Sequence, residues 1–256
     1  MKPGNALYGQ QRFTGPSIAY DLRRAFVSPL RAWKVARRWA LLARCTDLSY
    51  AELMRYRREL LDNREFRGHL ESCLDSVPYA FPGAAELYAV VRATKPHVIV
   101  ETGVASGISS AHILRALAAN GAGMLYSIDL PNVQQGSVLP EGRTSGWIVP
   151  DSLRRRWKLH IGDSRELLPK LLGTLDHVDL FLHDGDHSYE NMLLEFELAL
   201  PKLAHGGMLM SDDIHLHSAW DDFCGKHGLR PGRAFHLGVT RKPWNVRISS
   251  AAHSAS

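Results

Sequence analysis

The sequence predicts an α/β fold, in which a Rossmann-like, doubly wound and mostly parallel sheet of seven strands follows an N-terminal helical extension. Two observations carry this prediction. From Pro78 onward, short apolar runs alternate with segments of helical period, as in repeated strand–helix–strand units. The runs are apolar along most of their length, which is typical of parallel strands covered by helices on both faces. The composition agrees, because 45% of the 256 residues are hydrophobic and 22% are charged, as in a globular protein with a sizeable core.

The predicted elements follow one another regularly. The strands are expected at 97–102, 124–129, 157–163, 178–184 and 206–213, and the helices at 107–119, 164–172, 188–203 and near 217–227. Residues 234–249 have the pattern of a closing hairpin, although Pro243 in their middle cannot donate to a strand ladder.

Residues 20–75 are expected to form helices. Val35, Trp39 and Leu42 recur at helical spacing and define an apolar face, while basic residues occupy another face. Such an amphipathic helix packs on the main domain or on a second subunit. Adsorption to an anionic membrane surface is the alternative, since basic helices that carry tryptophan can lie in the interface.

The positive charge is confined to this N-terminal part. Residues 1–78 contain 14 Lys and Arg against 8 Asp and Glu, whereas the remaining residues are close to neutral. This asymmetry argues against a nucleic-acid groove across the main domain. We therefore divide the chain into a basic helical extension (1–77), a main α/β domain (78–250) and a flexible tail (251–256).

The sequence also limits the cellular setting. The longest apolar run is about five residues, far short of the roughly 20 that span a bilayer, and the first residues lack the apolar stretch of a secretory signal. Three scattered cysteines without a C-x-x-C motif make a disulfide framework improbable. We expect a reduced, cytoplasmic protein.

Acidic residues end every predicted strand. In an open α/β sheet these ends lie at one edge, where ligands bind. A single aspartate there is often only a helix cap, but clustered like charges repel one another unless a ligand or cation is present. The residues at these five ends are Glu101, Asp129, Asp163, Asp184 and the pair Asp212 and Asp213.

The glycine loop after the first strand indicates the kind of ligand. A dinucleotide-binding loop would need glycine at positions 105 and 108, where this chain has Ala105 and Ile108. The remaining Gly103 and Gly107 form a turn that opens a helix, whose N–H groups together with the Ser109 hydroxyl could hold a carboxylate.

The acidic residues at the next two strand ends indicate the remaining parts of the ligand. Asp129 is expected to accept hydrogen bonds from a ribose diol, and Asp163 to receive an exocyclic amine. A carboxylate, a ribose and an adenine in this order describe S-adenosylmethionine.

Five motifs together carry a family resemblance: VETGVASGISS, YSIDLP, HIGDSRELLP, FLHDGDHSYE and GGMLMSDDI. Over roughly residues 78–240 the chain resembles the class I S-adenosylmethionine-dependent methyltransferases, within them the metal-dependent branch of catechol, caffeoyl-CoA and antibiotic-sugar O-methyltransferases. The resemblance implies a set of cofactor-binding residues. These are Glu101, Gly103, Gly107 and Ser109 at the methionine moiety, Asp129 at the ribose, and Asp163 and Ser164 at the adenine.

The last two strand ends predict a metal site. Because neighbouring strands lie about 4.8 Å apart, Asp184 can converge with Asp212 and Asp213 on one hard cation. The resemblance implies the same three ligands and usually Mg²⁺, although nearby histidines would also suit Mn²⁺, iron or zinc. A metal that holds the acceptor hydroxyl lowers its pKa and directs it at the methyl group.

His187 is the predicted general base. It follows Asp184 by three residues, where catechol-type enzymes often carry a lysine, and a histidine can accept a proton near neutral pH. His215, two residues after Asp213, is the next candidate.

A long segment after the ribose aspartate is expected to cover the site. Residues 131–150 are rich in Gly and Pro without periodicity, as in a lid over cofactor and acceptor. Trp147 or Arg143 could then contact the acceptor.

The sequence thus predicts a divalent-metal-dependent O-methyltransferase that acts on a hydroxyl of a small molecule or of a sugar or glycan precursor, with a homodimer through the N-terminal helices as a further expectation. A non-catalytic cofactor-binding partner subunit is the first alternative, which the acidic groups on two strand ends argue against. A nicotinamide-dependent reductase is the second. The chain lacks the glycines that such a reductase requires. A Tyr-x-x-x-Lys pair beginning at Tyr189 would also need lysine at position 193, where the chain has Leu193.

Overall fold

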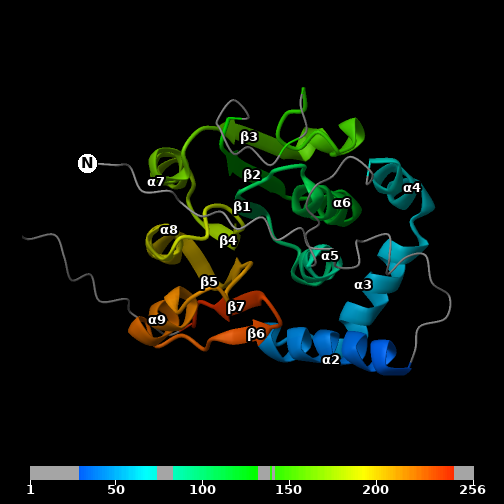
Figure 1. The fold of residues 1–256 in the computed structure, drawn as a ribbon, viewed down its shortest axis with the longest axis horizontal. Helices are drawn as coiled ribbons and strands as arrows, with labels where there is room; N and C mark the ends of the chain where they lie inside the picture. Colours follow the sequence, from blue (N-terminus) through cyan, green and yellow to red (C-terminus); the bar gives the residue numbers. More distant parts are fainter. Residues whose placement is uncertain (1–28, 74–82, 132–138, 140–141, 245–256) are drawn as a thin grey trace, which may run out of the picture.

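The computed structural model describes residues 29–73, 83–131, 139 and 142–244. Three helices precede the α/β part of the chain: α2 (Pro29–Thr46), α3 (Tyr50–Asp62) and α4 (Arg64–Cys73). The remaining elements alternate largely as expected (Figure 1). They are α5 (Ala84–Thr94), β1 (Val98–Thr102), α6 (Ile108–Asn120), β2 (Met124–Asp129), the short 3₁₀ helix η2 (Asp151–Arg156), β3 (Trp157–Ile161), α7 (Ser164–Thr174), β4 (Val178–His183), α8 (Tyr189–Lys202), β5 (Leu203–Ser211), α9 (Ala219–Lys226), β6 (Gly232–Ala234) and β7 (Leu237–Arg241).

The seven strands form one sheet in the order β3-β2-β1-β4-β5-β7-β6. The first five strands in this order pair in parallel, and β7 runs antiparallel to both β5 and β6. The chain builds outward from β1 through β2 to β3, and then returns to place β4 on the other side of β1. The strand order therefore reverses between β1 and β4, which is where ligands bind in doubly wound sheets.

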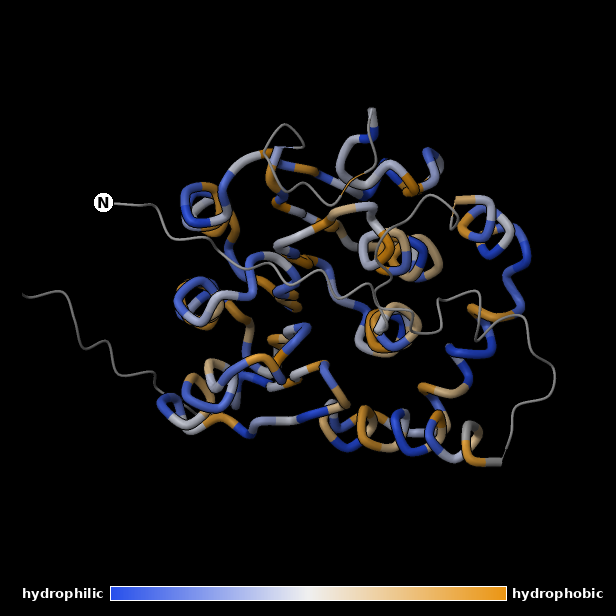
Figure 2. The backbone as a smooth tube through the Cα atoms, in the orientation of Figure 1, coloured by the Kyte–Doolittle hydropathy of each residue, from blue (hydrophilic) through white to orange (hydrophobic). Residues whose placement is uncertain are grey.

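Helices cover both faces of the sheet. Alternating side chains of β1 belong to two different cores, since Ile99 packs with α5 and α6 while Val100 packs with α7 and α8. Figure 2 shows hydrophobic residues along the strands and interspersed with hydrophilic ones on the flanking helices. Burial of both strand faces explains the continuous apolar runs in the sequence.

The N-terminal helices share the first of these cores. Trp39 and Leu42 of α2 and Leu53 of α3 are buried in the same cluster as residues of α5 and the sheet. The apolar face read from the sequence thus packs on the α/β part of the same chain. The opposite face of α2, with Trp33 and Arg37, is exposed.

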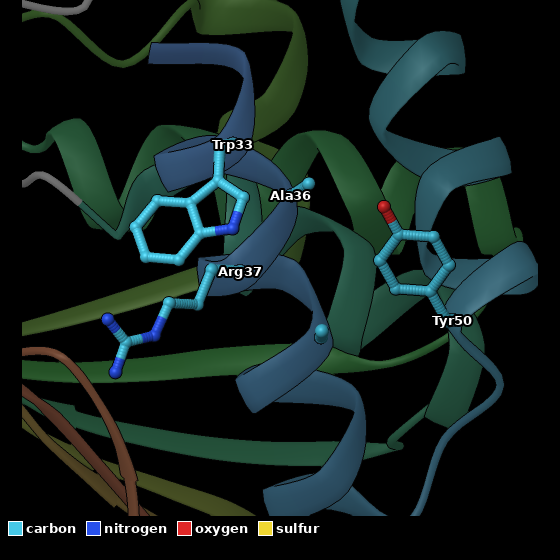
Figure 3. Close-up of a pocket in the computed structure, with 5 residues that line it drawn as sticks. Trp33, Ala36, Arg37 and Tyr50 are labelled. Carbon is cyan, nitrogen blue, oxygen red and sulfur yellow. The ribbon is translucent and has the colours of Figure 1, made fainter. Parts of the chain in front are cut away.

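A shallow groove of about 430 Å³ lies on that outer face (Figure 3). It is lined by Trp33, Ala36, Arg37, Ala40 and Tyr50. The structure contains a single chain, so the expected homodimer and the alternative membrane contact stay predictions. Among the described residues, no helix is both long and apolar enough to cross a bilayer.

Two sequence expectations need correction. The closing hairpin is formed by β6 and β7, so it begins before residue 234, and Pro243 lies beyond β7 instead of in the middle of a strand. The helix α5 was not predicted. Its residues Ala84 and Glu86–Val91 are all buried, so it lacks the polar face by which an amphipathic helix is recognised.

Part of the expected lid is outside the described residues, namely 132–138 and 140–141. Residues 142–150 pack against the loop after β1, where Gly146 N–H donates to the Ala105 carbonyl (2.8 Å) and Ile148 N–H to that of Ser106 (3.2 Å). Arg143 lies over the Trp147 ring. This part of the segment is thus attached to the predicted cofactor loop.

Candidate functional site

The carboxyl ends of β1 and β4 lie in direct backbone contact. Asp184 N–H donates to the Thr102 carbonyl (2.8 Å), and Gly103 N–H donates to that of Ile128 (2.9 Å). Gly103 has a φ of +82°, and a β-carbon there would lie 2.0 Å from the Asp184 carbonyl oxygen. The glycine therefore allows the loop after β1 to approach the loop after β4.

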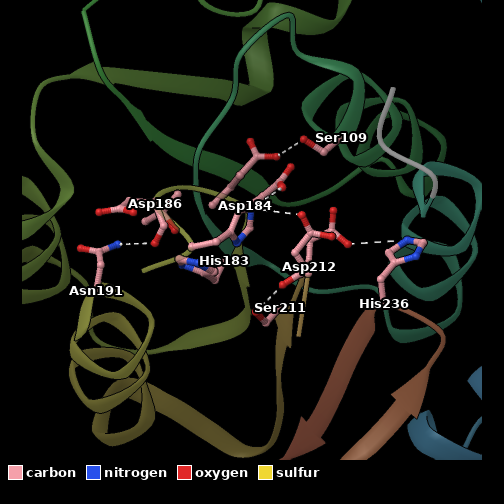
Figure 4. A network of polar contacts seen from close by, with 12 residues as sticks. Ser109, His183, Asp184, Asp186, Asn191, Ser211, Asp212 and His236 are labelled. Atoms are coloured by element: carbon pink, nitrogen blue, oxygen red, sulfur yellow. Dashed lines mark hydrogen bonds and ion pairs between the residues drawn. The ribbon is translucent and has the colours of Figure 1, made fainter. Parts of the chain in front are cut away.

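Glu101 is completely buried beneath this loop. Its carboxylate accepts hydrogen bonds from the hydroxyls of Ser109 (2.6 Å), Ser110 (2.6 Å) and Ser127 (2.7 Å). Burial raises its pKa, and the three hydroxyl donors act in the opposite direction. Two predicted methionine-site residues, Glu101 and Ser109, are thus bonded to each other, as the Ser109 contact in Figure 4 shows. Their hydrogen bonds hold the start of α6 against β1.

The loop between Gly103 and Gly107 leads into α6. Gly107 caps the helix in the left-handed region (φ +95°), and a β-carbon there would lie 2.7 Å from Cα of Gly146. The α6 N-terminus begins at the strand switch point, where its N–H groups favour a negatively charged ligand group.

Asp129 ends β2 next to the same loop. Its Oδ2 accepts a hydrogen bond from Ala105 N–H (3.1 Å), and its side chain is half-buried. In the part of the chain that the structure describes, the other carboxylate oxygen makes no hydrogen bond, and Asp129 lies beside both the loop after β1 and the end of β2.

Asp163 and Ser164 have clear structural roles. Asp163 caps α7 by accepting from Arg165 N–H (2.9 Å), and its carboxylate pairs with the Arg165 guanidinium at 2.5 Å. This pairing lowers the pKa of Asp163. Ser164 hydrogen-bonds to the buried Glu195. The helix-cap alternative is therefore realised at Asp163.

The carboxylates that follow β4 and β5 lie close together at the carboxyl edge of the sheet. We call these three residues, Asp184, Asp212 and Asp213, the rim. Burial, followed by repulsion from Asp212, raises the pKa of Asp184 well above its usual range. Burial and repulsion from Asp213 raise the pKa of Asp212 to about 7. Asp212 Oδ1 is buried without a hydrogen-bond partner among the described residues. The negative charges of these groups repel one another, and a cation bound between them would relieve this repulsion.

His187 faces this rim from the loop after β4. Its Nε2 lies 3.8 Å from Asp184 Oδ1 and 3.9 Å from Asp213 Oδ2. Burial and the neighbouring His183 lower its pKa to about 4, so the imidazole is neutral near pH 7. His215 Nδ1 is 3.7 Å from Asp213 but its side chain is 54% exposed.

A residue that the sequence interpretation missed is His236. It lies in the turn between β6 and β7, and its Nε2 is 3.6 Å from Asp212 Oδ1 (Figure 4). Burial and the positive charge of Arg38 lower its pKa to about 4. Only the hairpin brings it to the rim, and no spacing in the sequence could show that.

The rim is not a finished coordination site. In the described part of the chain, no group of three His, Cys, Asp or Glu side chains is arranged to hold a metal ion. The three predicted ligands are neighbours, since the charges of Asp212 and Asp213 both act on Asp184.

The comparisons with known proteins agree with the fold. Residues 100–214 match the family model described as a methyltransferase domain. The chain resembles the class I S-adenosylmethionine-dependent methyltransferases. The match begins within β1 and ends at the residue after the Asp212–Asp213 pair, so the matched segment contains all the predicted site residues.

Solved structures of methyltransferases, two of them described as O-methyltransferases, share this architecture. That of Bacillus cereus in complex with SAH has a TM-score of 0.53 at 15% identity and covers 73% of this chain and 96% of its own. TomG of Streptomyces achromogenes, involved in tomaymycin synthesis and bound to SAM, has a TM-score of 0.52 at 16% identity over 71% and 91%. The SAH-bound methyltransferase PaMTH1 of Podospora anserina has a TM-score of 0.51 at 15% identity over 71% and 88%. No curated protein matches the chain.

Proposed function

We propose that this methyltransferase is a divalent-metal-dependent O-methyltransferase that methylates a hydroxyl of a small molecule or of a sugar or glycan precursor. The observation that carries the proposal is the position of neutral His187 beside Asp184 and Asp213, at the strand switch point. A base and an acidic rim next to the cofactor loop are what the activation of an alcohol requires.

The cofactor proposal assigns one group to each strand end. The α6 N-terminus and the loop after β1 bind the methionine carboxylate, and Asp129 accepts hydrogen bonds from the ribose hydroxyls. Asp163 and Ser164 border the adenine. Since Asp163 is already paired with Arg165, we assign it the weaker contribution to affinity.

The metal proposal rests on donor chemistry. Asp184, Asp212 and Asp213 offer only carboxylate oxygens, which suit Mg²⁺ and also Mn²⁺. Asp212 Oδ1 is buried and makes no hydrogen bond among the described residues, and a bound cation would relieve the repulsion among these carboxylates. When bound, S-adenosylmethionine supplies the methyl group and the cation supplies Lewis acidity at the acceptor oxygen.

The residues of the chain then act in a simple order. The loop after β1 and the α6 N-terminus would hold the methionine end of the cofactor, and the rim carboxylates would align the acceptor hydroxyl. His187 Nε2 would accept the proton of that hydroxyl, whose oxygen would take the methyl group that the bound cofactor supplies, and S-adenosylhomocysteine would leave. Packing of residues 142–150 on the loop shields the methionine end from water.

The test is calorimetric titration of the metal-stripped protein with S-adenosylhomocysteine, repeated with Mg²⁺ or Mn²⁺, followed by an acceptor screen of alcohols and phenols. We expect binding that Asp129→Ala weakens and metal uptake that Asp184→Ala abolishes. Binding without turnover on any acceptor would favour the non-catalytic partner subunit, and absence of binding would contradict the cofactor proposal.

A further inference from the structure

The outer face of α2 carries large apolar side chains that are exposed. Leu30 and Trp33, one helical turn apart, are 62% and 56% exposed, and Tyr50 at the start of α3 is exposed as well. The small residues Ala36 and Ala40 line the same groove as Trp33 and Tyr50 (Figure 3). In Figure 1, α2 lies at the edge of the molecule. Large apolar side chains gathered on an exposed face indicate an interaction surface.

The charge of this face has one sign. Lys34, Arg37 and Arg44 are exposed, and in the described part of the chain none of them forms an ion pair. The Arg37 guanidinium lies over the Trp33 ring, 5.3 Å from its centroid. Residues 29–46, which form α2, contain no Asp or Glu. The face thus combines apolar side chains with positive charge that the helix itself does not balance.

Arg38 of the same helix shows the contrast. It is turned toward the α/β part of the chain, where its Nε lies 2.6 Å from Oε1 of the buried Glu86. A basic residue on the inner side of α2 is therefore matched by an acidic residue, whereas Lys34, Arg37 and Arg44 on the outer side are matched only by solvent or by an anionic partner.

The chemistry of this face favours one kind of partner. In a symmetric pair of chains the same patch would meet its own copy, so Lys34, Arg37 and Arg44 would face like charges. An acidic protein surface would match the charge but not the apolar side chains of Leu30 and Trp33. An anionic lipid surface matches both, because tryptophan and leucine insert at the boundary of headgroups and acyl chains while lysine and arginine attract the headgroups.

We propose that the outer face of α2 docks the protein onto an anionic membrane surface. Leu30 and Trp33 insert among the lipid headgroups, and Lys34, Arg37 and Arg44 contact the headgroup charges. The helix lies in the plane of the membrane surface instead of crossing it. The net positive charge of residues 1–78, with 14 Lys and Arg against 8 Asp and Glu, attracts this side of the molecule to the membrane over a longer range. The docking does not depend on the proposed methyl transfer.

The test is sedimentation of the full chain with lipid vesicles. Vesicles of phosphatidylcholine and phosphatidylserine in a ratio of about 3:1 present the anionic surface, and vesicles of phosphatidylcholine alone are the neutral comparison. We expect the wild type to bind the mixed vesicles at least about tenfold more tightly than the neutral ones, and to be released as the salt concentration rises. Failure of the wild type to bind the mixed vesicles would overturn the proposal.

Two variants of the outer face identify the docking residues. Trp33→Ser removes the largest inserted side chain and is expected to weaken binding to the mixed vesicles about tenfold. Arg37→Glu reverses one charge and is expected to weaken it about 25-fold, at about fivefold per unit of charge. Both side chains are exposed, so the variants should fold, and urea unfolding checks this. An unchanged affinity of either variant would overturn the proposal.

Matched controls lie at the opposite edge of the sheet, which ends in β3, whereas α2 packs along β6. Ile161→Ser removes an exposed apolar side chain at the end of β3, and Arg155→Glu reverses an exposed charge in η2. Both should bind the mixed vesicles within about threefold of the wild type, because charges further from the lipid than a Debye length are screened. A loss of affinity in these controls as large as in the α2 variants would contradict docking through α2.

A second copy of the chain is the competing occupant of this face. Analytical ultracentrifugation of the wild type and of Trp33→Ser measures it without lipid. A wild type that does not bind vesicles but forms a dimer, which Trp33→Ser dissociates, would assign the face to a second copy and overturn the proposal.

Discussion

Gly103 is held against the backbone carbonyl of Asp184, so that a β-carbon on Gly103 would come within 2.0 Å of the Asp184 oxygen. This contact joins the loop proposed to bind the methionine moiety to the loop that carries the proposed metal ligand and base. Binding of the cofactor and alignment of the acceptor thus depend on one backbone junction.

Gly103→Ala is expected to disrupt this junction. The alanine would need both a left-handed backbone and the space of the Asp184 carbonyl, so we expect loss of S-adenosylhomocysteine binding together with a destabilisation of several kcal/mol. Gly121→Ala is the matched control, because Gly121 is also left-handed (φ +76°) but has no atom within 4 Å of an added β-carbon. It should cost only about 1 kcal/mol and leave binding intact. Calorimetry and urea unfolding measure both, and equal effects of the two variants would refute the steric argument.

Asp129→Ala is expected to weaken S-adenosylhomocysteine about 10- to 100-fold, since it removes the charged acceptor proposed for the ribose hydroxyls. The fold should change little, because the half-buried side chain makes one hydrogen bond with Ala105. Asp151→Ala at the exposed start of η2 is the control for loss of one charge. Similar affinities of the two variants, measured by calorimetry, would remove Asp129 from the cofactor site.

Asp163→Ala should act mainly on stability. Loss of the α7 cap and of the pairing with Arg165 is expected to cost about 1 kcal/mol in urea unfolding. The accompanying loss of S-adenosylhomocysteine affinity should be smaller than that of Asp129→Ala. A larger loss of affinity would mean that Asp163 contributes more to adenine binding than its pairing with Arg165 suggests.

Metal uptake should depend on the rim carboxylates. With Mn²⁺ as a spectroscopic probe, Asp184→Asn and Asp212→Asn are expected to raise the Kd at least about tenfold by removing a charged oxygen ligand. Asp186→Asn is the control, as Asp186 is an exposed carboxylate two residues after Asp184 that bonds to Ser188. Equal Mn²⁺ binding in all three variants, or none in the wild type, would withdraw the metal from the mechanism.

Acid should destabilise the protein through His112. This residue of α6 is buried, and its burial lowers its pKa from 6.5 to about 4. Because the folded state disfavours the charged form, the contribution of His112 is complete above about pH 6.5 and is lost as the pH falls to about 4, by up to about 3 kcal/mol. Unfolding free energies at several pH values should fall less steeply in His112→Gln, while exposed His177→Gln should follow the wild type. Parallel curves for His112→Gln and the wild type would contradict the assigned pKa.

Much of the fold could be predicted because the strands are buried on both faces. The strand 124–129 was predicted with the bounds that the structure has, and the other parallel strands to within a few residues. The helix α5 was missed because it is also buried on nearly all sides. A helix of this kind has no polar face, so its sequence shows no amphipathic periodicity. The hairpin was shifted because Pro243 and the residues around it resemble strand in composition while β7 ends before them.

The site could be predicted only where topology alone brings residues together. Carboxylates at the ends of parallel strands share an edge in any such sheet, so the rim around Asp184 followed from strand positions. His236 and Glu195 depend on a turn and on the rotation of a helix. In α8, Glu190, Glu195 and Glu197 look alike in the sequence, and only the packing of the helix shows that Glu195 alone of the three is buried.

The place of α2 beside the last strands also governs how the molecule is made. Arg241 of β7 donates to the Thr46 carbonyl at the end of α2 across 195 residues of sequence (2.8 Å), and α2 lies along β6 (Figure 1). At roughly 5 to 20 residues per second, translation needs about 10 to 40 seconds to deliver that strand after the helix. Trp39 and Leu42 pack in one cluster with Leu237 and Val239. On the nascent chain they therefore lack part of their buried surroundings. The N-terminal helices reach their final place only after β7 has left the ribosome.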